Sequence, residues 1–519
     1  MLVSFRRAKR SVSLEQTPAR IDSSTRDRTT TAIILAFAAA TVLAHWVFGN
    51  RYGFQRDELQ TLDDARHLAW GYVAYPSLTP LFGRLSLTLF GNSLRGFRCF
   101  ASLALAAALL ISGLMARRLG GRRGAQLLTA FAVMPAAIGA GMLMQYVAFD
   151  YLCWVLTAYF VVRLLTSADP RWWLAIGAAI GCGMEAKYTM GFFALGVAAG
   201  TLLTDARGYL RSKWLWMGVA VSILLFLPNL AWQARHGFVS LDFLRHIHAR
   251  DVRLGRTKGF LPFQFKMTLL AAPLWIAGLW FCLFSREGKR FRLLGWMYVV
   301  PLLLFVAAKG RGYYLQPAYP MLYAAGAVWC EQGLQRLSSA WKGIVRTAAW
   351  VALAADIVLV SALFLPIAPI GSPWFHWASS INGDLPEEIG WPELVREVAR
   401  IRDSLPLQDR ARLGILGTNY GEAGAVNLYG PEYGLPRAIS GVNSFWYRGY
   451  GDPPPQILIV LGLPQREMQR RFQSCELAGH TPRIDDVRNE EAEDHSDIFV
   501  CRGLKESWPS FWSDFHYYG

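Results

Sequence analysis

The chain has 519 residues, of which 53% are hydrophobic and 17% are charged, and its mean hydropathy is +0.24. Charged residues make up about 25% of soluble domains, so the composition argues against an ordinary soluble protein. A net charge of +16 would suggest a nucleic-acid partner in a soluble chain. Here the basic residues lie mostly in short connections between apolar segments, as in membrane proteins, and we expect no nucleic-acid binding.

Residues 1–29 are rich in Arg, Ser and Thr and are predicted to form a disordered cytoplasmic tail. Several of the apolar segments that follow run for about 18–20 residues with almost no charge, enough to cross a bilayer core. They predict about eleven membrane spans. These lie near 30–48, 97–115, 125–143, 149–166, 171–184, 188–204, 214–230, 264–284, 293–308, 313–332 and 347–367.

The connections between these segments differ in their content of Lys and Arg. Alternate short connections are basic, and with eleven spans they fall on the same side as the tail. Their basic residues are Arg117, Arg118, Arg122, Arg123, Arg171, Arg207, Arg211, Lys213, Arg286, Lys289, Arg290, Arg292, Arg336, Lys342 and Arg346. Because Lys and Arg are retained on the cytoplasmic face, that side is predicted to be cytoplasmic.

The opposite side is predicted to hold two long loops, 49–96 and 231–263, and everything after the last span. Within 30–519, residues 30–367 therefore form a membrane domain, and 368–519 form an extracytoplasmic domain. In the latter, alternation of helix and strand patterns predicts a small α/β fold. The predicted helices are Pro392–Ser404 and Gln465–Phe472, and the predicted strands are Leu413–Leu416, Ile457–Leu461 and Ile498–Cys501. Cys475 and Cys501 could pair there or remain free thiols.

The first candidate functional motif is Arg56-Asp57-Glu58-Leu59, directly after the first span. Two adjacent carboxylates at a membrane surface are costly unless they serve a function. A structural interpretation makes Asp57 the N-cap of a helix over 58–70, with Gln60 at the third position. The two interpretations are compatible, because an N-cap carboxylate is ionised and a general base must be ionised.

Further candidates lie in the tight turns of the same side. Asp150 is a second acid, at the outer start of a span, where it could simply be an N-cap. Lys187 lies between two spans and either snorkels or binds a phosphate. The turn Lys309-Gly310-Arg311-Gly312-Tyr313-Tyr314 combines two cations with two phenols. Such a turn suits an anionic group, either a substrate phosphate or the head groups of outer-leaflet lipids.

At these residues the chain resembles the bacterial members of the dolichyl-phosphate-mannose protein mannosyltransferase family, glycosyltransferase family 39, in the branch related to the aminoarabinose lipid A transferases. The resemblance extends over nearly the whole chain. It rests on Tyr52–Leu59, His67–Val73, Pro76–Leu78, Phe149–Asp150, Lys187–Thr189, Tyr313–Pro320, Asn419–Val426, Gly430–Pro436 and Ile439–Ser444.

The resemblance implies a GT-C fold in the bacterial inner membrane and transfer, with inversion, of a sugar from a polyprenyl-phosphate carrier. It makes Asp57 the general base for the acceptor hydroxyl, with Glu58 and His67 shaping the loop. Lys187, Lys309 and Arg311, with Tyr313 and Tyr314, would hold the carrier phosphate, which becomes the leaving group. Asp150 would orient a cation or the acceptor. No cofactor is required, although a divalent cation is compatible with this chemistry.

The acceptor implied by the resemblance is an envelope lipid such as lipid A, a glycan or a protein hydroxyl. A membrane transporter or lipid flippase with an outer accessory domain is the alternative. That alternative needs ionisable residues near the bilayer midplane and interrupted helices there. In this sequence the charges lie at the ends of the predicted spans. A third class, a membrane scaffold that presents the outer domain, predicts that loss of the Asp57 carboxylate has no effect.

Overall fold

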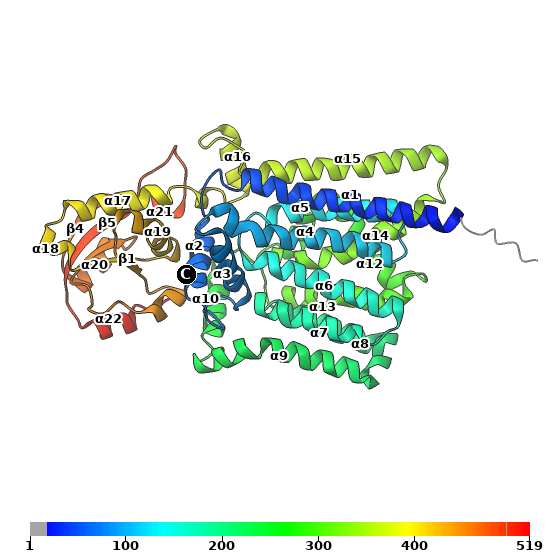
Figure 1. Ribbon diagram of the computed structural model, residues 1–519, viewed down its shortest axis with the longest axis horizontal. Coiled ribbons are helices and arrows are strands. Elements are labelled where there is room, and N and C mark those ends of the chain that lie inside the picture. The colour runs from blue at the N-terminus through cyan, green and yellow to red at the C-terminus, as the bar shows by residue number, and fades with distance from the viewer. Residues whose placement is uncertain (1–17, 495) are drawn as a thin grey trace, which may run out of the picture.

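The computed structural model describes residues 18–494 and 496–519. Its helices form a long bundle, and the C-terminal domain covers one end of that bundle (Figure 1). The first helix, α1 (Pro18–Phe48), begins twelve residues before the first predicted span. The part of the predicted tail that the structure describes is therefore helical, as expected where a long apolar helix extends into the residues before it. Residues 1–17 of that tail lie outside the described range.

Seven stretches in the described residues are long and apolar enough to cross a membrane, and they make this a multi-pass membrane protein. They lie in α1 (Arg28–Phe48), α4 (Leu94–Arg118), α6 (Tyr146–Ser167), α9 (Lys213–Arg235), α11 (Phe260–Thr268) with α12 (Ala272–Phe284), α13 (Arg292–Ala307, the span starting at Lys289) and α15 (Ser339–Phe364). Four other predicted spans coincide with helices that fall short of that length or hydropathy. These are α5 (Arg123–Ala140), α7 (Trp172–Ala186), α8 (Met190–Leu203) and α14 (Tyr319–Leu334). The count of eleven therefore stays a prediction.

Small residues bring the helices of the bundle into close contact. A Cβ atom added to Gly177 of α7 would lie 1.9 Å from the carbonyl oxygen of Gly218 in α9, and one added to Gly278 of α12 would lie 2.0 Å from the carbonyl oxygen of Leu322 in α14. In a membrane, where apolar surface gains little from helix contact, such close backbone packing is a main source of association energy. These contacts fix the frame on which the outer loops rest.

The loops predicted to lie outside form three helices at the end of the bundle that faces the C-terminal domain: α2 (Arg56–Arg66), α3 (Leu78–Phe90) and α10 (Val239–Arg253) (Figure 1). The N-cap of α2 is Gln55, whose side chain accepts the backbone N–H of Asp57, and Glu58 completes the capping box. The interpretation of Asp57 as the N-cap is therefore wrong, because the helix starts earlier than 58. The helix also ends at Arg66 rather than at 70. Near this end, the Tyr72 hydroxyl donates a hydrogen bond to the backbone carbonyl of Asp64.

The C-terminal domain is an α/β fold around a five-stranded sheet in the order β2-β1-β3-β5-β4. Strands β1, β2 and β3 are parallel, and β5 is antiparallel to both of its neighbours. The strands are β1 (Leu413–Gly417), β2 (Ala438–Ile439), β3 (Ile457–Leu461), β4 (Phe472–His480) and β5 (Asp497–Leu504). The helices are α16 (Pro373–Ile381), α17 (Trp391–Ser404), α18 (Leu407–Arg410), α19 (Tyr420–Tyr429), α20 (Gln465–Arg471), α21 (Glu490–Glu493) and α22 (Trp508–Asp514).

Two half-cystines join the two antiparallel strands at one edge of this sheet. Cys475 of β4 lies directly opposite Cys501 of β5, and the two form a disulfide with Cα atoms 4.1 Å apart. Of the two alternatives that the sequence leaves open, the structure has the pair.

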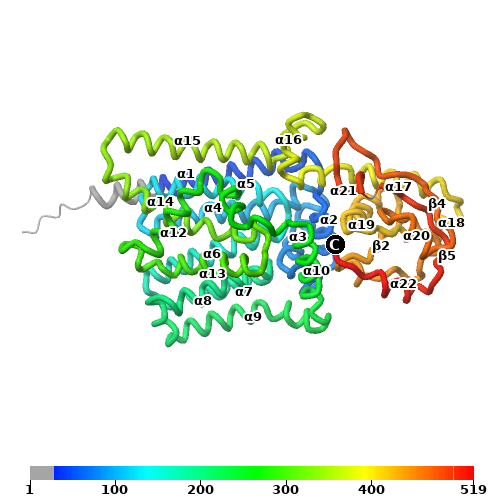
Figure 2. Tube along the Cα trace, turned by 180° about the vertical axis from the view of Figure 1, so that it is seen from behind, coloured from blue at the N-terminus to red at the C-terminus, as the bar shows by residue number. Residues whose placement is uncertain are grey.

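The C-terminal domain is docked on the outer loops through α19, which packs across α2. At their contact a Cβ atom added to Gly424 would lie 2.8 Å from the Cβ of Leu59 and 2.9 Å from its carbonyl oxygen. Seen from behind, the domain again meets the bundle at the end that carries α2, α3 and α10 (Figure 2). Helix α2 is thus enclosed between the bundle and the C-terminal domain.

Candidate active site

Asp57, the predicted general base, lies in the first turn of α2 and is half-buried. The Tyr420 hydroxyl donates a hydrogen bond to its Oδ1 atom at 2.8 Å, and the Gln145 amide donates a long one to its Oδ2 atom at 3.3 Å. In the described part of the chain, no Lys or Arg forms an ion pair with Asp57. Its carboxylate is therefore held by neutral donors alone.

Glu58, the neighbouring acid, is fully buried and lies in an ion-pair network. Arg98 of α4 bonds it through Nε at 2.9 Å and through Nη2 at 2.5 Å, and the backbone N–H of Met144 donates to its Oε1 at 2.8 Å. The same guanidinium reaches the carbonyls of Gly49 and Gly53 and the carboxylate of Glu388. The structure thus places Glu58 between the bundle and the loops, where it fixes the start of α2.

Asp63 and Asp64, near the other end of α2, both pair with Arg448 of the C-terminal domain. Burial alone would raise the pKa of Asp63, but the hydrogen bond with His67 and the charge of Arg448 lower it to about 2. Burial raises the pKa of Asp64 to about 6 despite the charge of Arg448. Tyr75 donates a hydrogen bond to Asp64 at 2.5 Å. These contacts join α2 to the C-terminal domain.

His67 ends the same helix and is partly exposed. Its Nδ1 atom lies 2.8 Å from the carbonyl oxygen of Asp63 and 3.5 Å from the Asp63 carboxylate. Its ring therefore contacts the turn of α2 that precedes it.

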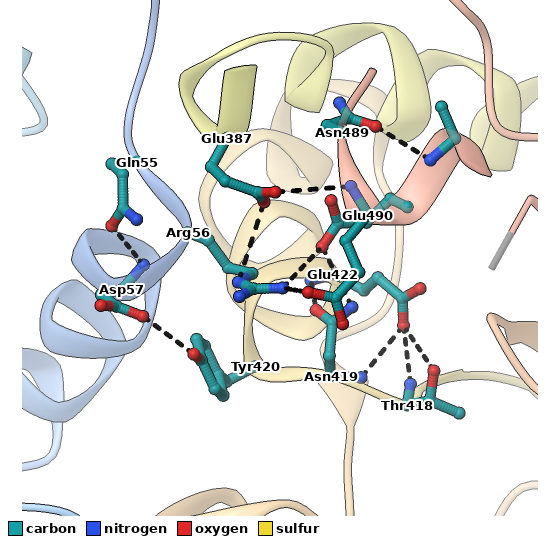
Figure 3. Close-up of polar contacts among 12 residues, drawn as sticks. Gln55, Arg56, Asp57, Glu387, Thr418, Asn419, Tyr420, Glu422, Asn489 and Glu490 are labelled. Carbon is teal, nitrogen blue, oxygen red and sulfur yellow. Dashed lines mark hydrogen bonds and ion pairs between the residues drawn. The ribbon is translucent and has the colours of Figure 1, made fainter. Parts of the chain in front are cut away.

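Arg56 precedes Asp57 in sequence but its side chain turns toward three glutamates of the C-terminal region (Figure 3). Its guanidinium pairs with Glu490, lies 3.8 Å from Glu387 and from Glu491, and lies over the Tyr420 ring at 5.7 Å. Burial and the neighbouring charge of Glu387 raise the pKa of Glu491 to about 8. The cluster joins the start of α2 to α21.

Lys187 follows α7 and points among three tyrosine rings. Its Nζ atom lies 5.1, 4.9 and 4.3 Å from the ring centroids of Tyr146, Tyr313 and Tyr314. Asp150 interacts with it electrostatically and accepts a hydrogen bond from the Trp154 indole at 2.9 Å. Asp150 lies one turn inside α6, whose N-cap is Gln145, so the N-cap interpretation of Asp150 is wrong. The helix begins earlier than the predicted span at 149.

Arg311 lies on the turn that leads to η4 (Gly312–Ala318), and it forms a two-pronged ion pair with Asp251 of α10. The two bonds measure 2.6 and 2.8 Å. Arg250 and Arg256 also interact with Asp251, and the Nε atom of Arg250 is buried without a hydrogen-bond partner. One carboxylate thus faces three guanidinium groups. Lys309, in contrast, is exposed, and the structure does not bring it into this group.

Tyr146 connects the acidic and the cationic groups. Its hydroxyl interacts electrostatically with Asp57, Arg311 and Tyr314. The predicted residues Asp57, Asp150, Lys187, Arg311, Tyr313 and Tyr314 therefore interact with Tyr146 or with one another, whereas Glu58 pairs with Arg98 instead. This arrangement places a carboxylate beside a cationic, phenol-lined site.

No group of three or more His, Cys, Asp or Glu among the described residues has the arrangement of a metal site. The carboxylates around Arg56 do not make one either. The described side chains therefore offer no ligand set on which a step through a divalent cation could be derived.

The sequence does not predict a role in this site for several residues, among them Tyr420, Arg98, Arg448 and Asp251. All four act through contacts between segments far apart in the chain. A local signal existed for one of them: Asn419 and Glu422 have the spacing of a capping box, which marks the start of α19 at Tyr420.

Residues 75–232 match the family model described as dolichyl-phosphate-mannose-protein mannosyltransferase. A comparison with curated proteins gives no match. Among solved structures, ArnT from Cupriavidus metallidurans is similar in the apo state (TM-score 0.61, 16% identity) and bound to undecaprenyl phosphate (TM-score 0.57, 15% identity). Both comparisons cover 91% of this chain and 98% of ArnT.

These likenesses confirm the resemblance predicted from the sequence and the fold class. The chain has an ArnT-like GT-C fold and a C-terminal α/β domain. The family match includes Lys187 and Asp150 but stops short of Asp57 on one side and of Arg311 on the other.

Proposed function

We propose that this chain is a membrane glycosyltransferase that moves a sugar from a polyprenyl-phosphate carrier to an acceptor on the outer face of the bacterial inner membrane. The fold shared with ArnT and the match to the mannosyltransferase family model support this proposal. One of the ArnT structures is bound to undecaprenyl phosphate, a member of the carrier class that we assign here. The acceptor is an envelope lipid, a glycan or a protein hydroxyl.

In the proposed reaction, the acceptor oxygen attacks the anomeric carbon from the face opposite the phosphate. The new carbon–oxygen bond forms as the bond between the anomeric carbon and the phosphate oxygen breaks, so the configuration inverts. The acceptor proton passes to Asp57, and the bonding electron pair leaves with the carrier phosphate. A phosphate leaving group needs no proton from the protein, and no cofactor enters this balance.

The observation that carries the proposal is the partner set of Asp57. Of the four acids of α2, Glu58, Asp63 and Asp64 are buried and each paired with an arginine. Asp57 is half-buried, and within the described residues its carboxylate oxygens accept hydrogen bonds from the neutral donors Tyr420 and Gln145. Asp57 is thus the acid of this helix that is most open to an acceptor hydroxyl and not committed to a cation, as a general base requires.

The cationic side of the site supports the assignment of the leaving group. Lys187 lies over the tyrosine rings, and Arg311 interacts with Tyr313 and Tyr314. Asp251 balances the charge of Arg311, and Arg250 adds a further cation beside that pair. Negative charge on the departing phosphate grows in the transition state. Fixed cations that face it lower the barrier.

The proposal is tested by mass spectrometry of lipids, glycans and proteins from the envelopes of cells with and without this chain. We expect a sugar-bearing species that requires the chain and disappears with Asp57→Asn, while the variant remains folded in the membrane. Asp242→Asn is the matched control, because Asp242 is an exposed acid of α10 at the same end of the bundle. Identical envelopes with and without the chain would overturn the proposal.

A transporter or flippase remains the alternative, and one residue favours it. Asp356 lies buried within α15, and its Oδ1 atom has no hydrogen-bond partner in the structure. Under the glycosyltransferase proposal, Asp356→Asn retains the sugar-bearing species. Loss of that species with Asp356→Asn but not with Asp57→Asn would favour the alternative.

A further inference from the structure

The C-terminal domain reaches the predicted base through one side chain. Tyr420 is the first residue of α19, and its hydroxyl donates to Oδ1 of Asp57 at 2.8 Å across 363 positions of sequence (Figure 3). The GT-C bundle supplies Asp57 on its first outer loop, so the site is shared between the two domains.

The position of Tyr420 is fixed by the cap of its own helix. The Asn419 side chain accepts the backbone N–H of Glu422 at 2.8 Å, and the Glu422 carboxylate accepts the N–H of Asn419 at 3.1 Å. The same carboxylate accepts the N–H of Thr418 at 2.7 Å. A reciprocal cap of this kind defines where a helix starts, and so it sets the direction of the tyrosine.

Arg56 adds a second constraint on the same contact. Its guanidinium lies over the Tyr420 ring and is flanked by Glu387 and Glu490 (Figure 3). Glu491 lies 3.8 Å from the same guanidinium. The cation favours the face of the phenol ring, and the glutamates hold the cation. Arg56 and Asp57 are adjacent in sequence, and both contact Tyr420, Arg56 at the ring and Asp57 at the hydroxyl. Two contacts therefore fix the position of Tyr420 relative to the carboxylate.

These contacts give the two carboxylate oxygens of Asp57 different hydrogen-bond partners. Oδ1 accepts the short bond from Tyr420, while Oδ2 accepts only the long bond from the Gln145 amide. Burial and the charge of Asp57 raise the pKa of Tyr420 well above its usual range, so the phenol stays a donor at neutral pH. The carboxylate is therefore held mainly through Oδ1, and Oδ2 is the oxygen left for an acceptor proton.

We infer that the C-terminal domain completes the active site and that Tyr420 is a positioning residue, which holds the Asp57 carboxylate so that Oδ2 receives the acceptor proton. This inference rests on the proposed function. It assigns to the outer domain a part in proton transfer in addition to any part in binding. A purely structural role for Tyr420 predicts instead that loss of its hydroxyl changes stability alone.

The first test compares Tyr420→Phe with Tyr429→Phe, which removes a hydroxyl from the other end of the same helix. With the sugar-bearing product identified as above, transfer is measured on purified protein in lipid nanodiscs. A misplaced catalytic group costs up to about 100-fold in rate, so we expect kcat of Tyr420→Phe to fall by about 10- to 100-fold. KM for the donor and the melting temperature should match those of Tyr429→Phe. An unchanged kcat would overturn the inference.

The second test does not depend on activity. A water-soluble carbodiimide modifies accessible carboxylates, and mass spectrometry of peptides reports the modification of Asp57. Because Tyr420→Phe frees Oδ1, we expect Asp57 to react several-fold faster in this variant than in the wild type, and unchanged in Tyr429→Phe. Equal rates would overturn the inference even if the enzyme is active. A wild-type protein that transfers no sugar would overturn the proposed function, while this labelling still decides whether Tyr420 holds Asp57.

Discussion

Asp57 and Glu58 are neighbours in sequence but face different surroundings. Successive residues of a helix point about 100° apart, so Glu58 turns into the interior toward Arg98 while Asp57 turns toward Tyr420. The same divergence separates Arg56, which joins the glutamate cluster. Three consecutive ionisable residues thus take three roles, and their sequence alone does not distinguish them.

The two carboxylates should respond differently when each is replaced by its amide. Glu58→Gln leaves the buried guanidinium of Arg98 with less compensating charge, and breaking a buried ion pair costs about 3–5 kcal/mol. We therefore expect this variant to lower the melting temperature of the protein in nanodiscs. Asp57→Asn, at a half-buried site without a cation partner, should leave it nearly unchanged. Equal melting temperatures for the two variants would contradict the roles assigned to these acids.

At the scale of elements, the sequence predicts what depends on local pattern. The apolar segments predict the helices of the bundle. Short strand-like runs predict β1, β3 and β5, and an amphipathic pattern predicts α17, since burial imposes these patterns directly. Strand β4 escapes prediction because it is an edge strand with mostly exposed, polar side chains. The candidate site is predicted in part. The sequence identifies its acids and cations at the ends of the predicted spans. It does not identify the contact between Tyr420 and Asp57, because that contact joins segments 363 positions apart.

The contact between α2 and α19 makes a second prediction at this scale. Gly424→Ala should favour the helix itself, by about 0.5–1 kcal/mol. The new methyl group would, however, lie 2.8 Å from the Cβ of Leu59 and 2.9 Å from its backbone oxygen, so α19 must move away from α2. We expect a loss of transfer activity of at least about 10-fold, because Tyr420 moves with the helix.

Activity of the purified variant measures this effect. Gly343→Ala in α15 is the control, because a Cβ atom at that position meets nothing within 4 Å. Wild-type activity in Gly424→Ala would show that the packing of α19 on α2 does not set the position of Tyr420.

For the whole molecule, the junction of the two domains is rich in carboxylates that burial makes hard to ionise. Burial raises the pKa of Glu388 to about 7, and burial with the charge of Glu387 raises that of Glu491 to about 8. Arg98 and Arg56 offset part of these shifts. The docked domain therefore carries a proton-dependent contribution to stability.

The direction of this pH dependence follows from the proton affinities of the two carboxylates in the folded and the unfolded protein. Glu388 and Glu491 bind protons more tightly in the folded state than in the unfolded state, so their contribution is fully present below about pH 4.5 and is lost as the pH rises through 7 and 8. We expect the melting temperature in nanodiscs to fall between pH 5 and pH 8, by roughly 2–4 °C or more. Glu491→Gln should flatten this decline. A melting temperature that rises over this range would contradict the assignment.

The disulfide and the basic connections together predict the orientation of the whole molecule in the membrane. Helix α1 runs toward the end of the bundle that carries the C-terminal domain (Figure 1), and the arginine-rich connections such as Arg117–Arg123 are predicted to be cytoplasmic. The domain then lies outside, where disulfides persist. Intact cells should show Cys475, the half-buried member of the pair, unreactive toward a membrane-impermeant maleimide until a reductant is added, and then reactive. Cys475→Ser with Cys501→Ser is the control, because it should remove the reductant-dependent signal. Labelling that appears only after the cells are opened would place the domain, and with it Asp57, on the cytoplasmic side.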